Sequence, residues 1–204
     1  KTAIKYLNRI HKDSRLYPET QLSIGTVYDF QKKYKKATLA LNKCIEKSTL
    51  EIELARHVKL KRYFTYLKES CQLHIGRSSF QRRHYTKSIK DYDTIAKTSY
   101  RWPHTLIEKA WANYHLKDYN RTLGLVVTYK SPLLSSYFYP ESEYLRALSY
   151  YKLCLWDDSL TTIAHYYKFY KSKSDSLRAI LDKESQSTDF FYNLTNKELN
   201  QAEK

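Results

Sequence analysis

The stretch from Pro140 to Tyr170 carries apolar residues at helical spacing in two blocks. The first block comprises Tyr144, Ala147, Leu148 and Tyr151, and the second comprises Leu160, Ile163, Ala164 and Tyr167. Spacings of three and four residues place each block on one face of a helix. Pro140 is tolerated at a helix start, and Asp157 or Asp158 can cap a second helix. The pattern therefore predicts two helices joined by a tight turn.

The same arrangement recurs along the chain, with a small residue where the two helices of each pair would cross most closely. The small residues of the second helices are Ala37, Ser88, Thr122 and Ser159, and Ala3 takes this place in a half-unit at the N-terminus. These five positions are separated by steps of 34, 51, 34 and 37 residues. A period of about 34 is typical of helix-turn-helix repeats. The step of 51 leaves room for one additional helix.

These units resemble the tetratricopeptide-repeat family. The family motif combines small and aromatic residues on the first helix, a Tyr after the turn, an Ala on the second helix and a Pro near the boundary. In the first unit it is matched by Gly25, Tyr28, Tyr34, Ala37 and Pro18. Later units depart from it, because Thr122 and Ser159 replace the Ala and Ser79 stands where an aromatic belongs. The segments around Tyr17 and Pro140 also resemble repeats of bacterial envelope proteins such as outer-membrane assembly lipoproteins.

The resemblance implies an all-α fold, a right-handed superhelical stack of about four units. We expect residues 1–172 to form this solenoid and residues 173–204 to form a capping helix and a polar tail. The expected parts are a half-repeat at 1–17, units at 18–48, 69–98, 103–130 and 140–171, and an extra helix at 50–68. The N-terminal half-repeat is expected to be helical from Thr2 to Leu16. The sequence leaves open whether 50–81 is one long helix or two.

The resemblance also implies a concave groove, lined by the first helices, that binds a protein or peptide. The family frame assigns partner binding to Arg77, Phe80, Ile107, Trp111, Tyr114, His115, Tyr144, Leu148, Tyr151 and Lys152, with Leu22, Thr26, Asp29 and Leu73 at matching positions. Trp, Tyr and Arg dominate binding hot spots. We therefore expect a non-catalytic scaffold or adaptor. The alternative that Trp111 and Tyr144 only pack against neighbouring helices stays open.

A formal net charge of +15 favours acidic partners. The segments 59–68 (KLKRYFTYLK) and 77–87 (RSSFQRRHYTK) mix cations with aromatic residues, as proteins that bind single strands do. An alternative function is therefore binding of nucleic acid or another anionic polymer, such as a cell-wall polymer or lipid head groups. Lysines spread over solvated helix faces would give the same net charge.

The residue types do not favour an enzyme, a cofactor or a metal site. Three glycines cannot form a Gly-rich phosphate loop, and the seven His lack the spacing of metal ligands. Cys71 and His74 are a conceivable nucleophile pair without a third group to orient it. No disulfide framework is expected, and Cys44 and Cys154 fall on positions that usually pack inward as free thiols.

No apolar run approaches the ~20 residues of a membrane span. The chain begins at Lys1 with half a repeat, which we interpret as a piece or mature form of a longer protein. The compartment stays open between the cell envelope or periplasm and the cytoplasm.

Overall fold

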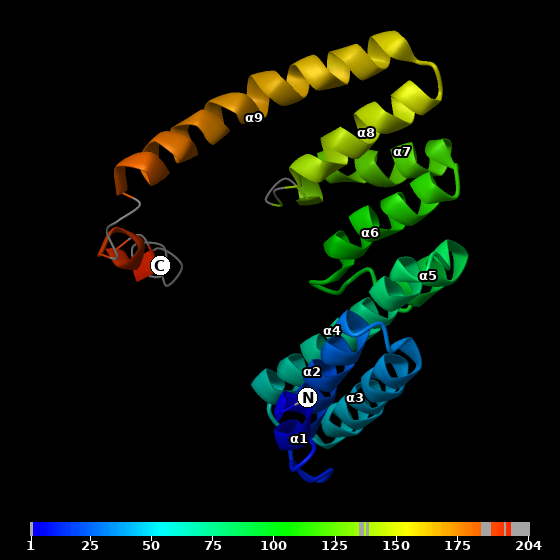
Figure 1. Ribbon diagram of the computed structural model, residues 1–204, viewed down its shortest axis with the longest axis vertical. Coiled ribbons are helices and arrows are strands. Elements are labelled where there is room, and N and C mark those ends of the chain that lie inside the picture. Colours follow the sequence, from blue (N-terminus) through cyan, green and yellow to red (C-terminus); the bar gives the residue numbers. More distant parts are fainter. Residues whose placement is uncertain (1, 135–136, 138, 185–188, 194, 197–204) are drawn as a thin grey trace.

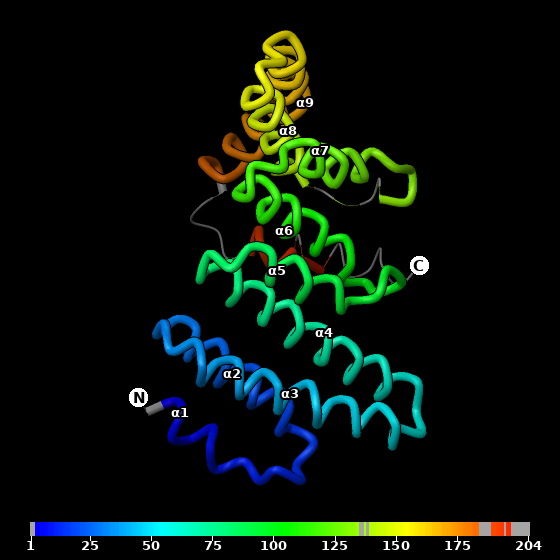
Figure 2. The backbone as a smooth tube through the Cα atoms, turned by 90° about the vertical axis from the view of Figure 1, so that its right-hand side faces the viewer, coloured from blue at the N-terminus to red at the C-terminus, as the bar shows by residue number. Residues whose placement is uncertain are grey.

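The computed structural model describes residues 2–134, 137, 139–184, 189–193 and 195–196, and within them regular structure is helical, with no β-strand (Figure 1). The α-helices are α1 Thr2–Leu7, α2 Tyr17–Phe30, α3 Tyr34–Leu54, α4 Val58–Gln81, α5 Tyr85–Tyr92, α6 Trp102–His115, α7 Tyr119–Val127, α8 Pro140–Lys152 and α9 Trp156–Glu184. Two 3-10 turns, η1 Thr128–Lys130 and η2 Pro132–Leu134, join α7 to α8. Each α-helix packs chiefly against its neighbours in the chain, as the tube in Figure 2 shows. The predicted all-α class is confirmed.

Among the described helices, four consecutive hairpins (α2–α3, α4–α5, α6–α7 and α8–α9) share one turn geometry. The turn residues Lys32, Arg83, Lys117 and Cys154 have positive φ angles of 57°, 60°, 62° and 59°. In each turn the next N–H donates to the carbonyl five residues earlier, for example from Lys33 to Tyr28 at 2.8 Å and from Leu155 to Tyr150 at 3.0 Å. Such a bond satisfies a free carbonyl at a helix C-terminus. The four hairpins are therefore structurally equivalent at their turns.

Four of the five predicted small residues are buried where the helices of a hairpin cross: Ala37, Ser88, Thr122 and Ser159. In the last three, the hydroxyl donates to the carbonyl twelve residues earlier, at Gly76, Ala110 and Ala147, with distances of 2.9, 3.3 and 3.1 Å. A hydroxyl in place of the Ala methyl is thus satisfied without leaving the crossing. The prediction for Ala3 is wrong, because this side chain is exposed.

The side chain four residues after the crossing fills the space beside the small residue of the first helix. Leu41 covers Gly25, and Tyr92 covers Gly76 so closely that a Cβ there would lie 2.3 Å from the ring. In the third hairpin Ala110 shares a core cluster with the smaller Val126. A large residue of the second helix thus packs on Gly of the first helix, and a smaller one packs on Ala, so that the hairpins stay closely packed.

Several expected boundaries need correction. The N-terminal helix ends at Leu7 and not at Leu16. No separate helix spans 50–68; α3 continues to Leu54, Ala55 takes an extended conformation, and α4 runs unbroken over 58–81. The additional residues of the 51-residue step belong to α3 and α4, which are longer than the other hairpin helices before α9. The apolar pattern continues on both sides of the break at residues 55–57.

The expected capping helix is also absent as a separate element, since α9 runs without interruption from Trp156 to Glu184. The apolar residues of the segment expected to form the cap include Leu177, Ile180 and Leu181, which are 61%, 43% and 48% exposed. They do not cover the last hairpin, and α9 extends away from the stack (Figure 1). The remainder of the predicted polar tail lies largely outside the described residues, at 185–188, 194 and 197–204.

A disulfide joins Cys44 of α3 to Cys71 of α4. It lies in the main core cluster, with Leu41, Phe64 and Leu67. The expectation of free thiols is therefore wrong for this pair, whose partners meet only because α3 and α4 pack side by side. Cys154 is the free cysteine, and it is exposed at the α8–α9 turn rather than buried.

Candidate groove on the first helices

Side chains of α4, α6 and α8 and of the adjoining helix starts form one connected group of rings, here named the aromatic wall. It comprises Phe80, Tyr85, Trp111, Tyr114, His115, Tyr119 and Tyr144. The rings of Tyr85 and His115 stack at 4.8 Å, and Trp111 lies 6.2 Å from His115 and 6.3 Å from Tyr144. Neighbouring aromatic rings at such distances stabilise each other beyond the area they bury. The wall thus connects three hairpins.

A second, smaller group lies about two helical turns further along α8. Tyr151 meets the ring of Trp156 edge to face at 5.1 Å, and the Lys152 ammonium lies 5.8 Å from the Tyr151 ring centre. Tyr151 is 54% exposed and Trp156 is 50% exposed. These rings combine apolar area with solvent access, which is typical of binding residues.

The predicted groove residues divide by burial. Tyr144 and Tyr151 are exposed, as are His115 and Lys152, whereas Arg77, Phe80, Trp111, Tyr114 and Leu148 are half-buried. Ile107 is a core residue, packed with Ala110, Val126 and Leu145. In the first two units Asp29 and Leu73 are also buried. Of the other first-unit positions, Leu22 is half-buried and Thr26 is exposed. The exposed rings of the predicted groove are therefore those of its α6–α8 end.

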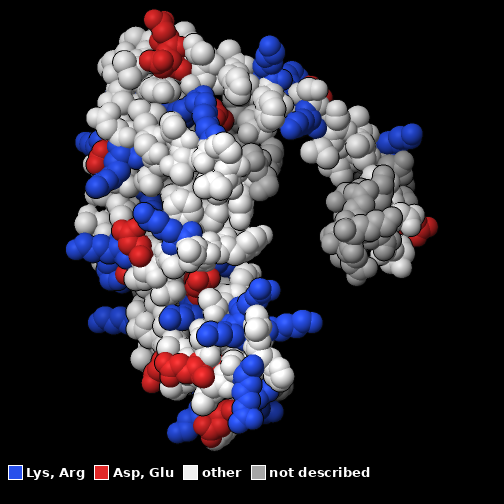
Figure 3. Space-filling view, turned by 180° about the vertical axis from the view of Figure 1, so that it is seen from behind, with Lys and Arg blue, Asp and Glu red and all other residues white. Residues whose placement is uncertain are grey.

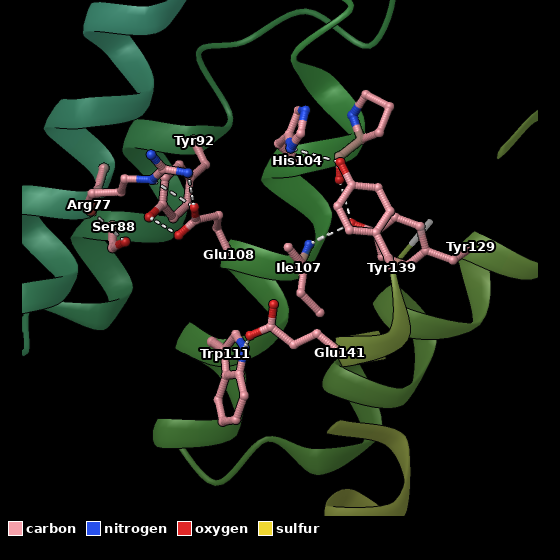
Figure 4. A network of polar contacts seen from close by, with 12 residues as sticks. Arg77, Ser88, Tyr92, His104, Ile107, Glu108, Trp111, Tyr129, Tyr139 and Glu141 are labelled. Atoms are coloured by element: carbon pink, nitrogen blue, oxygen red, sulfur yellow. Dashed lines mark hydrogen bonds and ion pairs between the residues drawn. The ribbon is translucent and has the colours of Figure 1, made fainter. Parts of the chain in front are cut away.

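Two glutamates orient the groove side chains (Figure 4). The Trp111 indole Nε1–H donates to Glu141 Oε1 at 2.6 Å, which fixes the ring against α8. Glu108 accepts from Arg77 Nε at 2.7 Å and from the Tyr92 hydroxyl at 3.1 Å. Because Arg77 is already paired with a carboxylate, it positions α4 against α6 and is not a free cation for a partner.

Sequence reasoning missed both glutamates and the three residues that open the second helices, Tyr85, Tyr119 and Trp156. Trp111 and Arg77 lie 30 and 31 positions from the glutamates they pair with, and Tyr92 lies 16 positions from Glu108. Helical periodicity relates only residues three, four or seven apart. The aromatic residues that open each second helix were visible as turn markers, and their recurrence at one place in each hairpin could have assigned them to the groove.

Further hydrogen bonds fix the start of α6. The Tyr129 hydroxyl accepts from the Ile107 N–H at 3.0 Å and donates to the Pro103 carbonyl. The Tyr139 hydroxyl lies 2.7 Å from Nδ1 of His104. Burial raises the pKa of Tyr129, and it raises the pKa of Tyr139 to about 12. Both phenols therefore stay neutral at physiological pH and act as hydrogen-bonding groups.

Two histidines beside the same helices are held neutral. Burial lowers the pKa of His74, and the charges of Arg77 and Arg101 lower it further. Burial and the same two arginines also lower the pKa of His104. His74 and His104 are therefore neutral at neutral pH.

The basic segments 59–68 and 77–87 lie toward opposite ends of α4. A helix of 24 residues is about 36 Å long. Lys61 and Arg62 line a hollow with Tyr66 and Tyr100, whereas Arg82 lines another hollow near the α2–α3 turn. The two segments thus do not form one surface, and Figure 3 shows cations spread over several parts of the molecule.

Other chemistry finds little support in the described part of the chain. No group of three or more His, Cys, Asp or Glu side chains is placed there to hold a metal ion. Cys71 lacks the thiol that a nucleophile pair with His74 requires, because it is disulfide-bonded. None of the described helices is long and apolar enough to cross a bilayer. The chain matches no known protein-family model and no curated protein.

Proposed function

We propose that this protein is a non-catalytic scaffold that binds a protein or peptide partner along the α6–α8 part of the groove. The proposal includes a tetratricopeptide-like superhelical arrangement, supported by the shared turns and by three of the four hairpins carrying the same hydroxyl-to-carbonyl contact at the crossing. Fold alone does not define function. Binding is therefore assigned from the side chains of the groove.

The aromatic wall is the observation that carries the proposal. Trp111 is held by Glu141 and by neighbouring rings, so its orientation is set before a partner arrives. Preorganised rings lose little conformational entropy on binding. Tyr144 and Tyr151, each 54% exposed, lie seven residues apart on α8 and so share one helix face. Together they present apolar area to a segment lying across α6 and α8.

The direct test is selection from a displayed peptide library, followed by affinity measurement with the enriched peptides. The double variant Tyr144→Ala/Tyr151→Ala removes two exposed rings and should weaken binding at least tenfold, because hot-spot aromatics each contribute about 2 kcal/mol or more. Trp111→Ala should weaken it similarly, with helicity measured in parallel because Trp111 is partly buried.

The matched control is Tyr6→Ala/Tyr100→Ala, which removes two exposed rings outside the groove. This control should bind the selected peptides as tightly as the native chain. Equal losses in both double variants would contradict the groove assignment. Unchanged affinity of the selected peptides for the Tyr144→Ala/Tyr151→Ala variant would show that the binding site lies elsewhere.

A further inference from the structure

Six exposed cations surround the turns of the first two hairpins, and we name them the turn patch. They are Lys32, Lys33, Lys35, Lys36, Arg82 and Arg83. The four lysines, Arg82 and Tyr34 line a shallow hollow of about 380 Å³. The two turns lie together because α2 packs on α4, where Ser78 donates to Asp29 Oδ1 at 2.7 Å.

Within the described residues, no cation of the turn patch forms an ion pair with a carboxylate. Lys36 lies over the ring of Tyr28 at 5.9 Å and Arg82 over the ring of Tyr34 at 5.7 Å. Asp29, the acid in the last turn of α2, is only 9% exposed and is directed to Ser78. The positive charge of the patch is therefore uncompensated by the protein.

The four turns follow one another along one edge of the molecule, on the right in Figure 1, and their charge changes sign along it. Equivalent windows show the change. Residues 31–36 carry four lysines and no acid, and residues 82–87 carry two arginines, one lysine and no acid. Residues 116–121 carry two cations and one acid, and residues 153–158 carry two aspartates and no cation. Along this edge, cations thus predominate at the first two turns and acids at the last.

The helices that begin in the turn patch also lack N-terminal caps. The N-cap residues of α3 and α5 are Lys33 and His84, and neither side chain caps the helix. The same holds for α2, α4, α6 and α8, whereas in α7 Asp118 accepts from the Arg121 N–H at 3.0 Å. Uncapped N-terminal amides attract anions, and phosphate groups in particular. The cations and these amides lie side by side at the first two turns.

Phe30, the last residue of α2, stands at the border of the patch and is 91% exposed. An apolar ring beside several lysines suits a lipid interface, where the ring enters the head-group region while the ammonium groups meet phosphates. A nucleic-acid strand would instead require successive free rings for its bases. Tyr28 and Tyr34 do not offer them, because cations cover their faces.

We propose that the turn patch docks this protein on the surface of an anionic phospholipid bilayer, with Phe30 entering the interface. The docking surface is separate from the α6–α8 groove and does not depend on the function proposed for it.

Co-sedimentation with phospholipid vesicles tests this directly. The native chain should bind vesicles that contain about one third anionic lipid, release them at high salt, and ignore purely zwitterionic vesicles. Each cation near an anionic surface strengthens binding about fivefold. A quadruple variant should therefore bind several hundredfold more weakly; it carries Lys32→Gln, Lys33→Gln, Lys35→Gln and Lys36→Gln. Phe30→Ser should weaken binding about tenfold. These side chains are exposed and form no ion pairs, so the variants should keep native helicity and thermal stability.

The matched control neutralises four exposed lysines of α9: Lys168→Gln, Lys171→Gln, Lys173→Gln and Lys183→Gln. It changes net charge equally and should weaken vesicle binding less than tenfold. An equal loss in both quadruple variants would show unspecific attraction and overturn the proposal. Full binding by Phe30→Ser, or binding to single-stranded RNA without binding to vesicles, would also overturn it.

Discussion

The first two hairpins and the last two share a turn but are held together differently. Between α3 and α4 the chain uses a disulfide inside an aliphatic and aromatic cluster, and its crossings bring Gly25 and Gly76 against large side chains. The later hairpins have Ala110 and Ala147 in place of these glycines, and they use ring contacts and hydrogen bonds from phenols and an indole. The same hairpin geometry is thus compatible with two kinds of core packing.

The charge distribution follows the same division. The turns of the first two hairpins are cationic, whereas the α8–α9 turn carries Asp157 and Asp158 and no cation. The two exposed tyrosines of the groove, Tyr144 and Tyr151, lie toward the other end, on α8. The comparison teaches that the repeat frame sets helix positions, while binding properties come from side chains that differ between repeats.

The largest expected effect is reduction of the Cys44–Cys71 disulfide. Opening a cross-link over 27 residues should lower the free energy of unfolding by about 3 kcal/mol. Denaturant titration with and without a reductant measures this loss, with Cys154→Ser as the background to prevent intermolecular exchange. A thiol assay on the unfolded, unreduced native chain should find one free cysteine; three would show that the bond is absent.

Next in size is the contact at Gly76. Its Cβ would overlap the ring of Tyr92, which is fully buried and bonded to Glu108. Gly76→Ala should therefore destabilise the protein by about 2 kcal/mol. The thermal unfolding midpoint measures the change.

Gly124 provides the matched control, because nothing lies within 4 Å of a Cβ there. Gly124→Ala on the exposed face of α7 should stabilise the protein by about 0.5 to 1 kcal/mol. Tyr92→Val imitates Val126 of the third hairpin and removes the overlap, so Gly76→Ala should cost less stability in a Tyr92→Val background than in the native chain. Similar destabilisation by both Gly→Ala variants would contradict the close-packing argument.

A smaller effect is expected from Tyr129→Phe. The change removes a hydroxyl that bonds both the Ile107 N–H and the Pro103 carbonyl while it keeps the ring. The loss should be about 1 kcal/mol, as for an ordinary buried hydrogen bond. Amide hydrogen exchange should show faster exchange at Ile107 than in the native chain. Unchanged exchange there would mean that the hydroxyl does not hold this turn.

The smallest effect concerns His74 and pH. Its pKa is lower in the folded chain than in the unfolded chain, so unfolding takes up a proton at mildly acidic pH. The stabilisation from keeping this ring neutral is complete above about pH 6.5 and declines as pH falls toward the folded pKa. His74→Gln should flatten the stability profile between pH 7 and 5, measured by denaturant titration at each pH. A profile that stays as steep in His74→Gln would assign the effect to another group.

Local pattern predicted the hairpins and four of the five crossing residues, because a helix face and a tight turn are encoded within about twenty neighbouring positions. Contacts between elements were missed. The disulfide, the Trp111–Glu141 bond and the Arg77–Glu108 pair join residues 27 to 31 apart on different helices. Ile107 was expected to line the groove, but it is buried because Leu145 of α8 packs against it. Periodicity within α6 does not reveal which of its residues another helix covers.

The Tyr129 hydroxyl lies between a donor and an acceptor that are one helical turn apart in α6, yet it belongs to the segment after α7. The opening turn of α6 consequently reaches its final form only after a residue more than twenty positions later has docked on it. During synthesis, α6 would leave the ribosome before Tyr129 does. Its first turn would therefore lack the hydrogen bonds to the Tyr129 hydroxyl until that residue has also emerged. The α6 part of the groove is thus expected to reach its final structure after the two preceding hairpins have folded.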